Sequence, residues 1–171
     1  MLILGLDPGS LHTGFGLLEK HGSALRAVDL GRFSCPRGLA LPNRLAFLCD
    51  CLSELLARHP PDLAVLEEPF YGLNVRSLIV LAQARGALLA LLAGRGIEIR
   101  EYSPAEVKSA VTGNGRADKG QVARMVRLLV RLDAFEGAGR PLTSDATDAL
   151  ALALCCAQRL RLDRLADLPR R

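Results

Sequence analysis

The chain has 171 residues, half of them apolar, which suits one compact globular domain with a substantial core. Lysine and arginine total 22 against 18 aspartates and glutamates, so the net charge of +4 is compatible with a polyanionic partner without identifying one. Five cysteines form no C-x-x-C pair and lie near no histidine cluster, which argues against a disulfide framework or a zinc site and predicts reduced thiols in the cytoplasm.

The first segment, 1–10, has the sequence MLILGLDPGS and places Asp7 between an apolar run and a Pro-Gly turn. A short apolar run bounded by turn residues predicts a buried central strand. An ionised carboxylate is strongly penalised inside a core unless a cation or hydrogen-bond donors surround it. We therefore interpret Asp7 as the first member of a site at the end of this strand.

Two further strands and a helix are predicted before residue 60. Segments 13–18 and 24–33 have the composition of strands and are joined through the turn 21–23, so with the first strand they predict an antiparallel meander. A helix is predicted to begin at Pro42 and to end before Pro60. Its leucines recur at helical spacing: Leu45, Leu48, Leu52, Leu55 and Leu56.

Strands and helices alternate in the next part of the chain. A fourth apolar strand, 63–66, is followed by Glu67 and Glu68, and a fifth strand spans 97–102. Between them a long helix is predicted over 74–93, with the first residue, an asparagine, as its cap. Gln83 and Arg85 interrupt the longest apolar stretch of this helix, so we predict no membrane span.

Helices dominate the last third of the sequence. Ser103 is predicted to cap a short helix over 104–111, where Glu106 completes a capping box. The glycine-rich loop TGNGR, 112–116, follows it. The next helix is predicted to begin at Asp118 and to bury three apolar residues, Val122, Val126 and Leu129.

The final helix is predicted to begin at Thr143 or Ser144 and to end near Leu160. Together the elements predict an α/β fold with a five-stranded mixed sheet, three antiparallel strands followed by parallel ones, and helices on both faces. We expect one domain over 1–160 and a polar, flexible tail over 161–171.

Four carboxylates lie where elements begin or end, beside apolar runs. Asp7 and Glu67 end strands, while Asp145 and Asp148 share one face of the first turn of the last helix. If these ends converge, the mutual repulsion would favour cations among them. Oxygen ligands without thiolate or imidazole indicate Mg²⁺, for which Mn²⁺ could substitute, and two such ions can cleave a phosphodiester.

Four segments of the sequence closely resemble the RuvC family of bacterial Holliday-junction resolvases, the crossover junction endodeoxyribonucleases. They are GLDPGSLHTGFG, LEEPFYGLNVRSLIVLAQARG, EVKSAVTGNGRADKGQVARMV and DATDALALAL, and the match covers residues 1–158. The resemblance implies a ribonuclease-H-like fold and a homodimer that resolves four-way DNA junctions by paired, symmetric nicks with two Mg²⁺ ions per active site. It also implies a branch-migration helicase as a partner.

The resemblance implies that Asp7, Glu67, Asp145 and Asp148 are the catalytic, metal-binding acids. It selects Glu67 over Glu68, whereas the residue pattern alone leaves this choice open, because successive strand residues point to opposite faces and both faces of the sheet are covered.

Basic and aromatic residues beside these acids are candidates for binding DNA. Lys108 and Lys119, which the resemblance implies are substrate-binding, lie on either side of the TGNGR loop. Arg116 ends that loop, and Arg124 follows on the next helix. Phe70 and Tyr71 directly follow the acidic strand end. The resemblance places Phe70 near the junction centre, and two aromatics before a glycine are able to stack on unpaired bases.

The helix over 74–93 is the predicted dimer interface. It is apolar around most of its circumference. A helix with one solvent-exposed face would show a polar stripe in its sequence, and this helix hardly shows one. Small residues recur along it at Ala82, Gly86 and Ala90 and would permit close approach by another helix. Complete burial within a monomer is the alternative interpretation.

Three other functions are alternatives. The run from Asp7 to Gly14 resembles the phosphate loop of actin-like sugar kinases, but those enzymes clasp nucleotide between two such domains. A non-catalytic nucleic-acid-binding module would not need the full set of acids. A nuclease for RNA–DNA hybrids or for RNA is disfavoured by the segments that contain Phe70 and the lysines.

Overall fold

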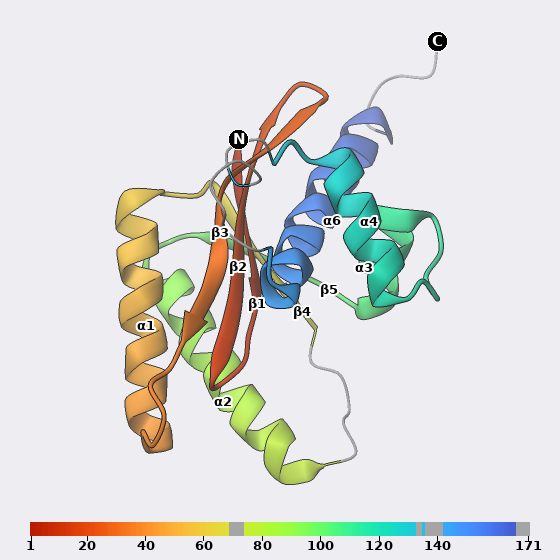
Figure 1. The fold of residues 1–171 in the computed structure, drawn as a ribbon. Helices are drawn as coiled ribbons and strands as arrows, with labels where there is room; N and C mark the ends of the chain where they lie inside the picture. The colour runs from red at the N-terminus through yellow and green to blue at the C-terminus, as the bar shows by residue number, and fades with distance from the viewer. Residues whose placement is uncertain (69–73, 133–134, 136–141, 167–171) are drawn as a thin grey trace.

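The computed structural model describes residues 1–68, 74–132, 135 and 142–166, with 161–166 described by backbone alone. One five-stranded sheet, in the order β3-β2-β1-β4-β5, separates two layers of helices. Figure 1 shows α1 and α2 on one face of the sheet and α3, α4 and α6 on the other. The predicted α/β fold with a mixed sheet covered on both faces is confirmed.

The sheet has the predicted mixture of directions. Strands β1 (Leu2–Asp7), β2 (His12–His21) and β3 (Ala24–Ser34) form an antiparallel meander. Strands β4 (Leu63–Glu67) and β5 (Glu98–Tyr102) add to it in parallel with β1. Because β1 and β4 are parallel neighbours, their carboxyl-terminal ends lie at the same edge of the sheet, and this edge carries the candidate site.

Helices α1 (Leu41–Arg58) and α2 (Val75–Gly94) cover one face with an apolar core. Four of the five predicted α1 leucines are buried, and Leu45 is partly buried at the margin of the same core. Asn74 caps α2 as predicted, because its side-chain oxygen accepts a hydrogen bond from the Ser77 amide at 3.1 Å.

By length and composition alone, α2 would be long and apolar enough to cross a membrane, a test that core helices of globular proteins also pass. The helix nevertheless packs through one side against α1 and β5. Arg85, halfway along it, is largely buried in an ion pair with Glu101 of β5.

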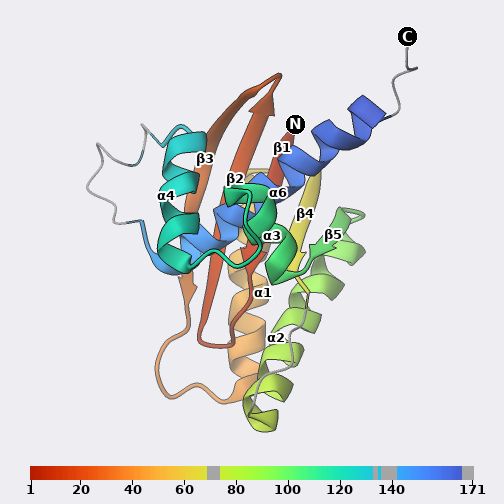
Figure 2. The same ribbon diagram turned by 90° about the vertical axis from the view of Figure 1, so that its right-hand side faces the viewer.

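The opposite face carries α3 (Pro104–Thr112), α4 (Lys119–Leu129) and α6 (Ser144–Ala166), which Figure 2 shows in front of the sheet. Helix α6 lies directly on β1 and β2 because glycines face it there. A Cβ built on Gly5 would lie 1.9 Å from the Ala149 carbonyl oxygen, and one on Gly14 would lie 2.1 Å from the Asp145 carbonyl oxygen. Side chains at these positions would push α6 off the sheet.

Three details of this layer refine the predictions. Val122 and Val126 are buried as predicted, but Leu129 is 38% exposed. It is the last residue of α4, and the chain then turns to extended geometry so that Val130 occupies the buried position instead. Thr143 caps α6 through a hydrogen bond from the Ala146 amide, and the helix continues to Ala166, beyond the predicted end near Leu160.

Candidate active site

The site is built on one row of residues that crosses three strands. Asp7 on β1 pairs with Gly14 on β2, and Gly14 pairs with Arg32 on β3. On the other side of β1, Glu67 ends the parallel strand β4 one residue beyond the Leu6–Leu66 pair. The sheet register therefore brings Asp7, Glu67 and Arg32 to one edge.

A pocket of about 300 Å³ opens at this edge, and the acids Asp7, Glu67 and Asp148 share its wall. The pocket lies between the sheet edge and the α3, α4 and α6 layer, which contributes Lys108 and Lys119 to its lining. Glu68 does not line it. Its side chain is exposed, and its amide donates to the Tyr102 carbonyl at 2.9 Å. Of the two glutamates, Glu67 is thus the one that faces the other acids.

The two aspartates of α6 are each held by a cation from a different element. Lys119 Nζ of α4 donates to Asp148 Oδ2 at 2.9 Å. Arg32 Nη1 of β3 donates to Asp145 Oδ2 at 3.1 Å, and Asp145, unlike Asp148, does not line the pocket. Asp145 comes close to the sheet only because the residue beneath it is Gly14, which has no side chain.

Burial and like charges dominate the electrostatics of the site. Burial, with the charges of Asp148 and Glu67 next in importance, raises the pKa of Asp7 to about 7. Burial and Asp148 also raise the pKa of Glu67, against the lowering effect of Lys119 and Lys108. The hydrogen bond to Asp148 raises the pKa of Lys119. The site therefore holds more negative charge than its two lysines neutralise.

The donor set of this site fits a hard divalent cation in its chemistry. Its ligands are carboxylate oxygens only, and their mutual repulsion would be relieved by positive charge. As the side chains stand, no three histidine, cysteine or acidic residues of the described part of the chain converge in a group that could hold a metal ion. Lys119 and Arg32 each occupy an oxygen that a cation would compete for, so binding requires these side chains to adjust.

Two arginines that touch the acids were not predicted as site residues. Arg32 is one of them. The other is Arg85 of α2, whose Nε donates to the Glu67 carbonyl at 3.2 Å while its Nη2 pairs with Glu101. In the sequence, Arg85 stands out only as an interruption of an apolar stretch. No local signal marks either residue, because both contacts depend on how distant elements pack.

The predicted DNA-binding residues have different placements. Lys108 and Lys119 line the acidic pocket, while Arg116 and Arg124 are exposed residues of the TGNGR loop and of α4. The backbone of Arg116 is held by its neighbour, since its amide donates to Asn114 Oδ1 at 3.0 Å. Phe70 and Tyr71 lie outside the described residues, so their predicted role is not addressed by the structure.

Comparison with known proteins gives a consistent match over almost the whole chain. The family model described as "Crossover junction endodeoxyribonuclease RuvC" matches residues 3–156. The protein of that name from Alkalilimnicola ehrlichii is 48% identical over 90% of this chain and 88% of its own length. The one from Chloroflexus aggregans is 45% identical over 91% of this chain and 92% of its own length.

Solved structures agree with these relatives. T. thermophilus RuvC in complex with a Holliday junction substrate superposes with a TM-score of 0.85 at 29% identity, covering 95% of this chain and 96% of the other. The yeast mitochondrial Holliday junction resolvase Ydc2 superposes with a TM-score of 0.68 at 15% identity, covering 95% and 82% respectively, which shows a common fold.

Proposed function

This chain belongs to the RuvC family of crossover junction endodeoxyribonucleases, and we propose that it resolves four-way DNA junctions by metal-dependent hydrolysis of two phosphodiester bonds, one on each of two opposing strands. The observation that carries the proposal is the pocket in which Asp7, Glu67 and Asp148 meet beside Lys108 and Lys119. Acids that hold cations next to lysines that attract phosphate are the combination that such a hydrolysis requires.

We assign the metal to Asp7, Glu67, Asp145 and Asp148. Two Mg²⁺ ions held there, which Mn²⁺ could replace, would supply an activated water and stabilise the leaving oxygen. The protein's own contribution is to fix these carboxylates in place. Two strand ends hold Asp7 and Glu67, and the first turn of α6 holds the two aspartates on the glycine-lined surface of the sheet.

The lysines of the pocket would orient the scissile phosphate and balance the charge that develops on it. Lys119 is suited to this role because its side chain is 81% exposed and can turn from Asp148 to DNA. Lys108 lines the same pocket from α3. We propose Arg116 and Arg124 as further phosphate contacts, and Phe70 and Tyr71 as aromatic residues that stack on bases at the junction centre.

Paired cutting needs two sites related by a twofold axis, and we propose that α2 provides it in a homodimer. One side of this helix is buried through Ala84, Leu88 and Leu92. The other side presents an exposed stripe of small and apolar residues at helical spacing: Val75, Ile79, Ala82, Gly86, Ala90 and Ala93. A stripe of this kind suits close packing against the same helix of a second copy.

Five free cysteines fit the reducing cytoplasm, where we place the protein. A branch-migration helicase as a partner remains a prediction from the family. Neither assignment affects the chemistry of the site.

The proposal is tested by incubating the protein with labelled four-way junctions, linear duplexes and RNA–DNA hybrids, with and without Mg²⁺. We expect cleavage of the junction only, and only with the metal. Asp7→Asn, Glu67→Gln, Asp145→Asn and Asp148→Asn should each abolish cleavage while junction binding persists, because removing negative charge does not weaken attraction to phosphate.

Glu68→Gln is the matched control for Glu67→Gln, since the two residues are adjacent and only Glu67 lines the pocket. It should cleave nearly as well as the wild type. Cleavage by Asp7→Asn at the wild-type rate would show that the acids are not the catalytic site. Preferential cutting of the RNA–DNA hybrid would show that the hybrid, and not the four-way junction, is the substrate.

A further inference from the structure

We propose that a hollow on the β3 side of α6 binds the DNA phosphate that neighbours the scissile phosphate on the same strand; the inference rests on the proposed function and extends it. The hollow has a volume of about 430 Å³. Arg32, Ser34, Arg58 and Thr143 supply its polar walls, together with Asp29. None of these residues is among the predicted DNA contacts.

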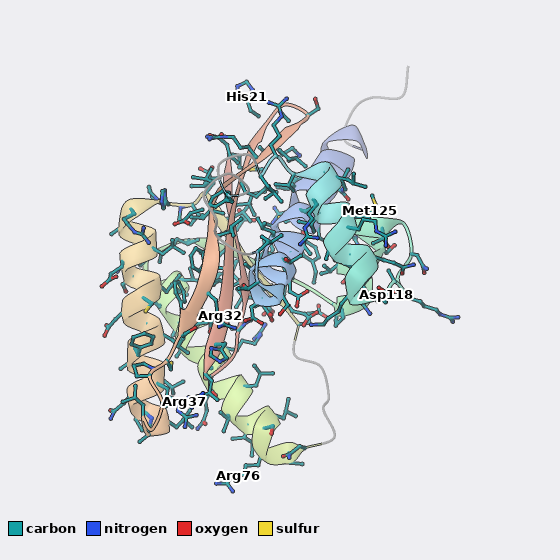
Figure 3. The ribbon with its side chains drawn as sticks, in the orientation of Figure 1. His21, Arg32, Arg37, Arg76, Asp118 and Met125 are labelled. Atoms are coloured by element: carbon teal, nitrogen blue, oxygen red, sulfur yellow. The ribbon has the colours of Figure 1, made fainter. Side chains whose placement is uncertain are left out.

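The position of the hollow follows from the register of the sheet. Arg32 lies in the same cross-strand row as Asp7, with only Gly14 between them. Asp145 lies over that glycine, and its carboxylate accepts a hydrogen bond from the Arg32 guanidinium at 3.1 Å. The hollow therefore begins where the acidic cluster ends, and Figure 3 marks Arg32 on β3 close to the first turn of α6. A strand whose scissile phosphate lies at the acids would reach this hollow with its next phosphate.

The walls of the hollow offer hydrogen-bond donors that suit a phosphate. The Arg32 Nε donates a hydrogen bond to Ser34 Oγ at 3.1 Å, and its Nη1 donates one to Asp145. Its Nη2 has no hydrogen-bond partner in the described part of the chain, so the guanidinium can bind phosphate without leaving Asp145. Ser34 Oγ acts as an acceptor there, which leaves its hydroxyl proton for an oxyanion.

Arg58, at the end of α1, supplies the second cation. Its side chain is 61% exposed, and its guanidinium lies 3.9 Å from Asp29 Oδ2, too far for a good hydrogen bond. Asp29 has other partners, because its Oδ1 accepts from the Leu30 amide at 2.9 Å and His59 Nε2 lies 3.7 Å from its Oδ2. Arg58 is thus available to a phosphate.

The role of Arg32 in holding Asp145 has to be separated from phosphate binding, and Arg58 permits this because it touches none of the four acids. We would measure junction binding in Mg²⁺ on the Asp7→Asn background, so that the DNA stays intact. A plot of log affinity against log salt concentration has a negative slope. Arg32→Ala and Arg58→Ala should each make this slope shallower by about one unit. Arg58→Lys should keep the slope, since the charge remains.

Arg95→Ala is the control, because Arg95 is an exposed arginine at the C-terminal end of α2, next to the start of β5 and so at the opposite edge of the sheet. The salt slope of this variant should match that of the parent, which is the Asp7→Asn protein with no further substitution. Junctions with a single neutral methylphosphonate locate the contact. Replacing the phosphate next to the scissile one should weaken binding by the parent and have no further effect in the Arg32→Ala, Arg58→Ala double variant.

An unchanged slope for Arg58→Ala would overturn the proposal, since the cation of the hollow that touches none of the four acids would then not bind phosphate. Equal sensitivity of parent and double variant to the methylphosphonate would also overturn it. If the parent failed to prefer four-way junctions over linear duplex, the proposed function would fall, and the slopes measured on duplex would still decide whether the hollow binds phosphate.

Discussion

Asp7 combines two roles that oppose each other in the metal-free protein. It ends a central strand, so it is partly buried, and it faces other acids. Its pKa rises from 3.8 to about 7 for these two reasons. An isolated monomer without metal therefore folds best when this carboxyl keeps its proton, whereas the proposed reaction needs it ionised. A bound cation reconciles the two requirements.

This conflict predicts a pH dependence of stability. The unfolded chain loses the Asp7 proton near pH 4 and the folded chain only near pH 7, so the contribution of this group to the free energy of unfolding is present at low pH and is lost as the pH rises between these values. The loss is on the order of 4 kcal/mol. Asp7→Asn, which mimics the protonated form, should become progressively more stable than the wild type over this range in chelator.

Denaturant unfolding at several pH values measures this difference directly. Saturating Mg²⁺ should reduce it, because the ion stabilises the ionised wild-type site. A difference between Asp7→Asn and the wild type that stays constant from about pH 4 to pH 8 would contradict the electrostatic account of the site.

At the scale of elements, type and order were predictable from the sequence because they depend on local signals. The apolar run before Asp7, the Asn74 and Ser103 caps and the leucine spacing of α1 are all readable without neighbours. The end of α6 was placed too early because 161–166 has no clear apolar stripe, although arginine, leucine and alanine there are strong helix formers.

The candidate site was predictable only in part, for a related reason. The sequence singled out the four acids by their positions at element ends, but not Arg32 and Arg85, whose contacts join residues 113 and 18 positions apart. Sheet register decides the first contact, because a shift of one residue would turn Arg32 to the other face of the sheet. The packing of α2 decides the second. The choice between Glu67 and Glu68 depended on tertiary packing in the same way.

The glycine-lined surface under α6 should determine the position of the two aspartates in its first turn. In Gly14→Ala the new methyl group would meet the Asp145 carbonyl at 2.1 Å, so α6 must move and carry Asp145 and Asp148 with it. We expect a loss of stability of at least about 1–3 kcal/mol and a loss of cleavage larger than stability explains. Thermal unfolding and junction cleavage test this together.

Gly94→Ala is the control, because a Cβ at this helical position would meet no atom within 4 Å. It should be neutral or stabilising by about 0.5–1 kcal/mol. If Gly14→Ala were as stable and as active as Gly94→Ala, the close approach of α6 to the sheet would not be what positions the aspartates.

At the scale of the whole molecule, the exposed stripe of α2 is the feature that a monomer does not explain. Ile79 lies within it with 54% of its surface exposed. Ile79→Glu would place a charge in the proposed interface, and we expect it to convert a dimer to a monomer in sedimentation velocity at micromolar concentration. Leu128→Glu on α4 is the control, since Leu128 is a comparably exposed apolar residue outside the stripe.

If the dimer persists in Ile79→Glu, the interface does not lie on α2. A wild-type protein that is monomeric at micromolar concentration and still cuts both strands of a junction in concert would remove the dimer from the account altogether. The Phe70→Ala variant adds a separate check on the junction centre, where we expect binding to persist and cleavage to become poor.

If two acid sites cut one junction in a paired fashion, the protein should linearise a supercoiled plasmid that extrudes a cruciform. Paired nicks across the cruciform produce linear plasmid, whereas a single nick releases the supercoiling, the cruciform is reabsorbed and cutting stops at the open circle. With Mg²⁺ we predict linear product as the main species for the wild type and none for Glu67→Gln. Open circle alone, or equal cutting of a plasmid without the inverted repeat, would contradict the account.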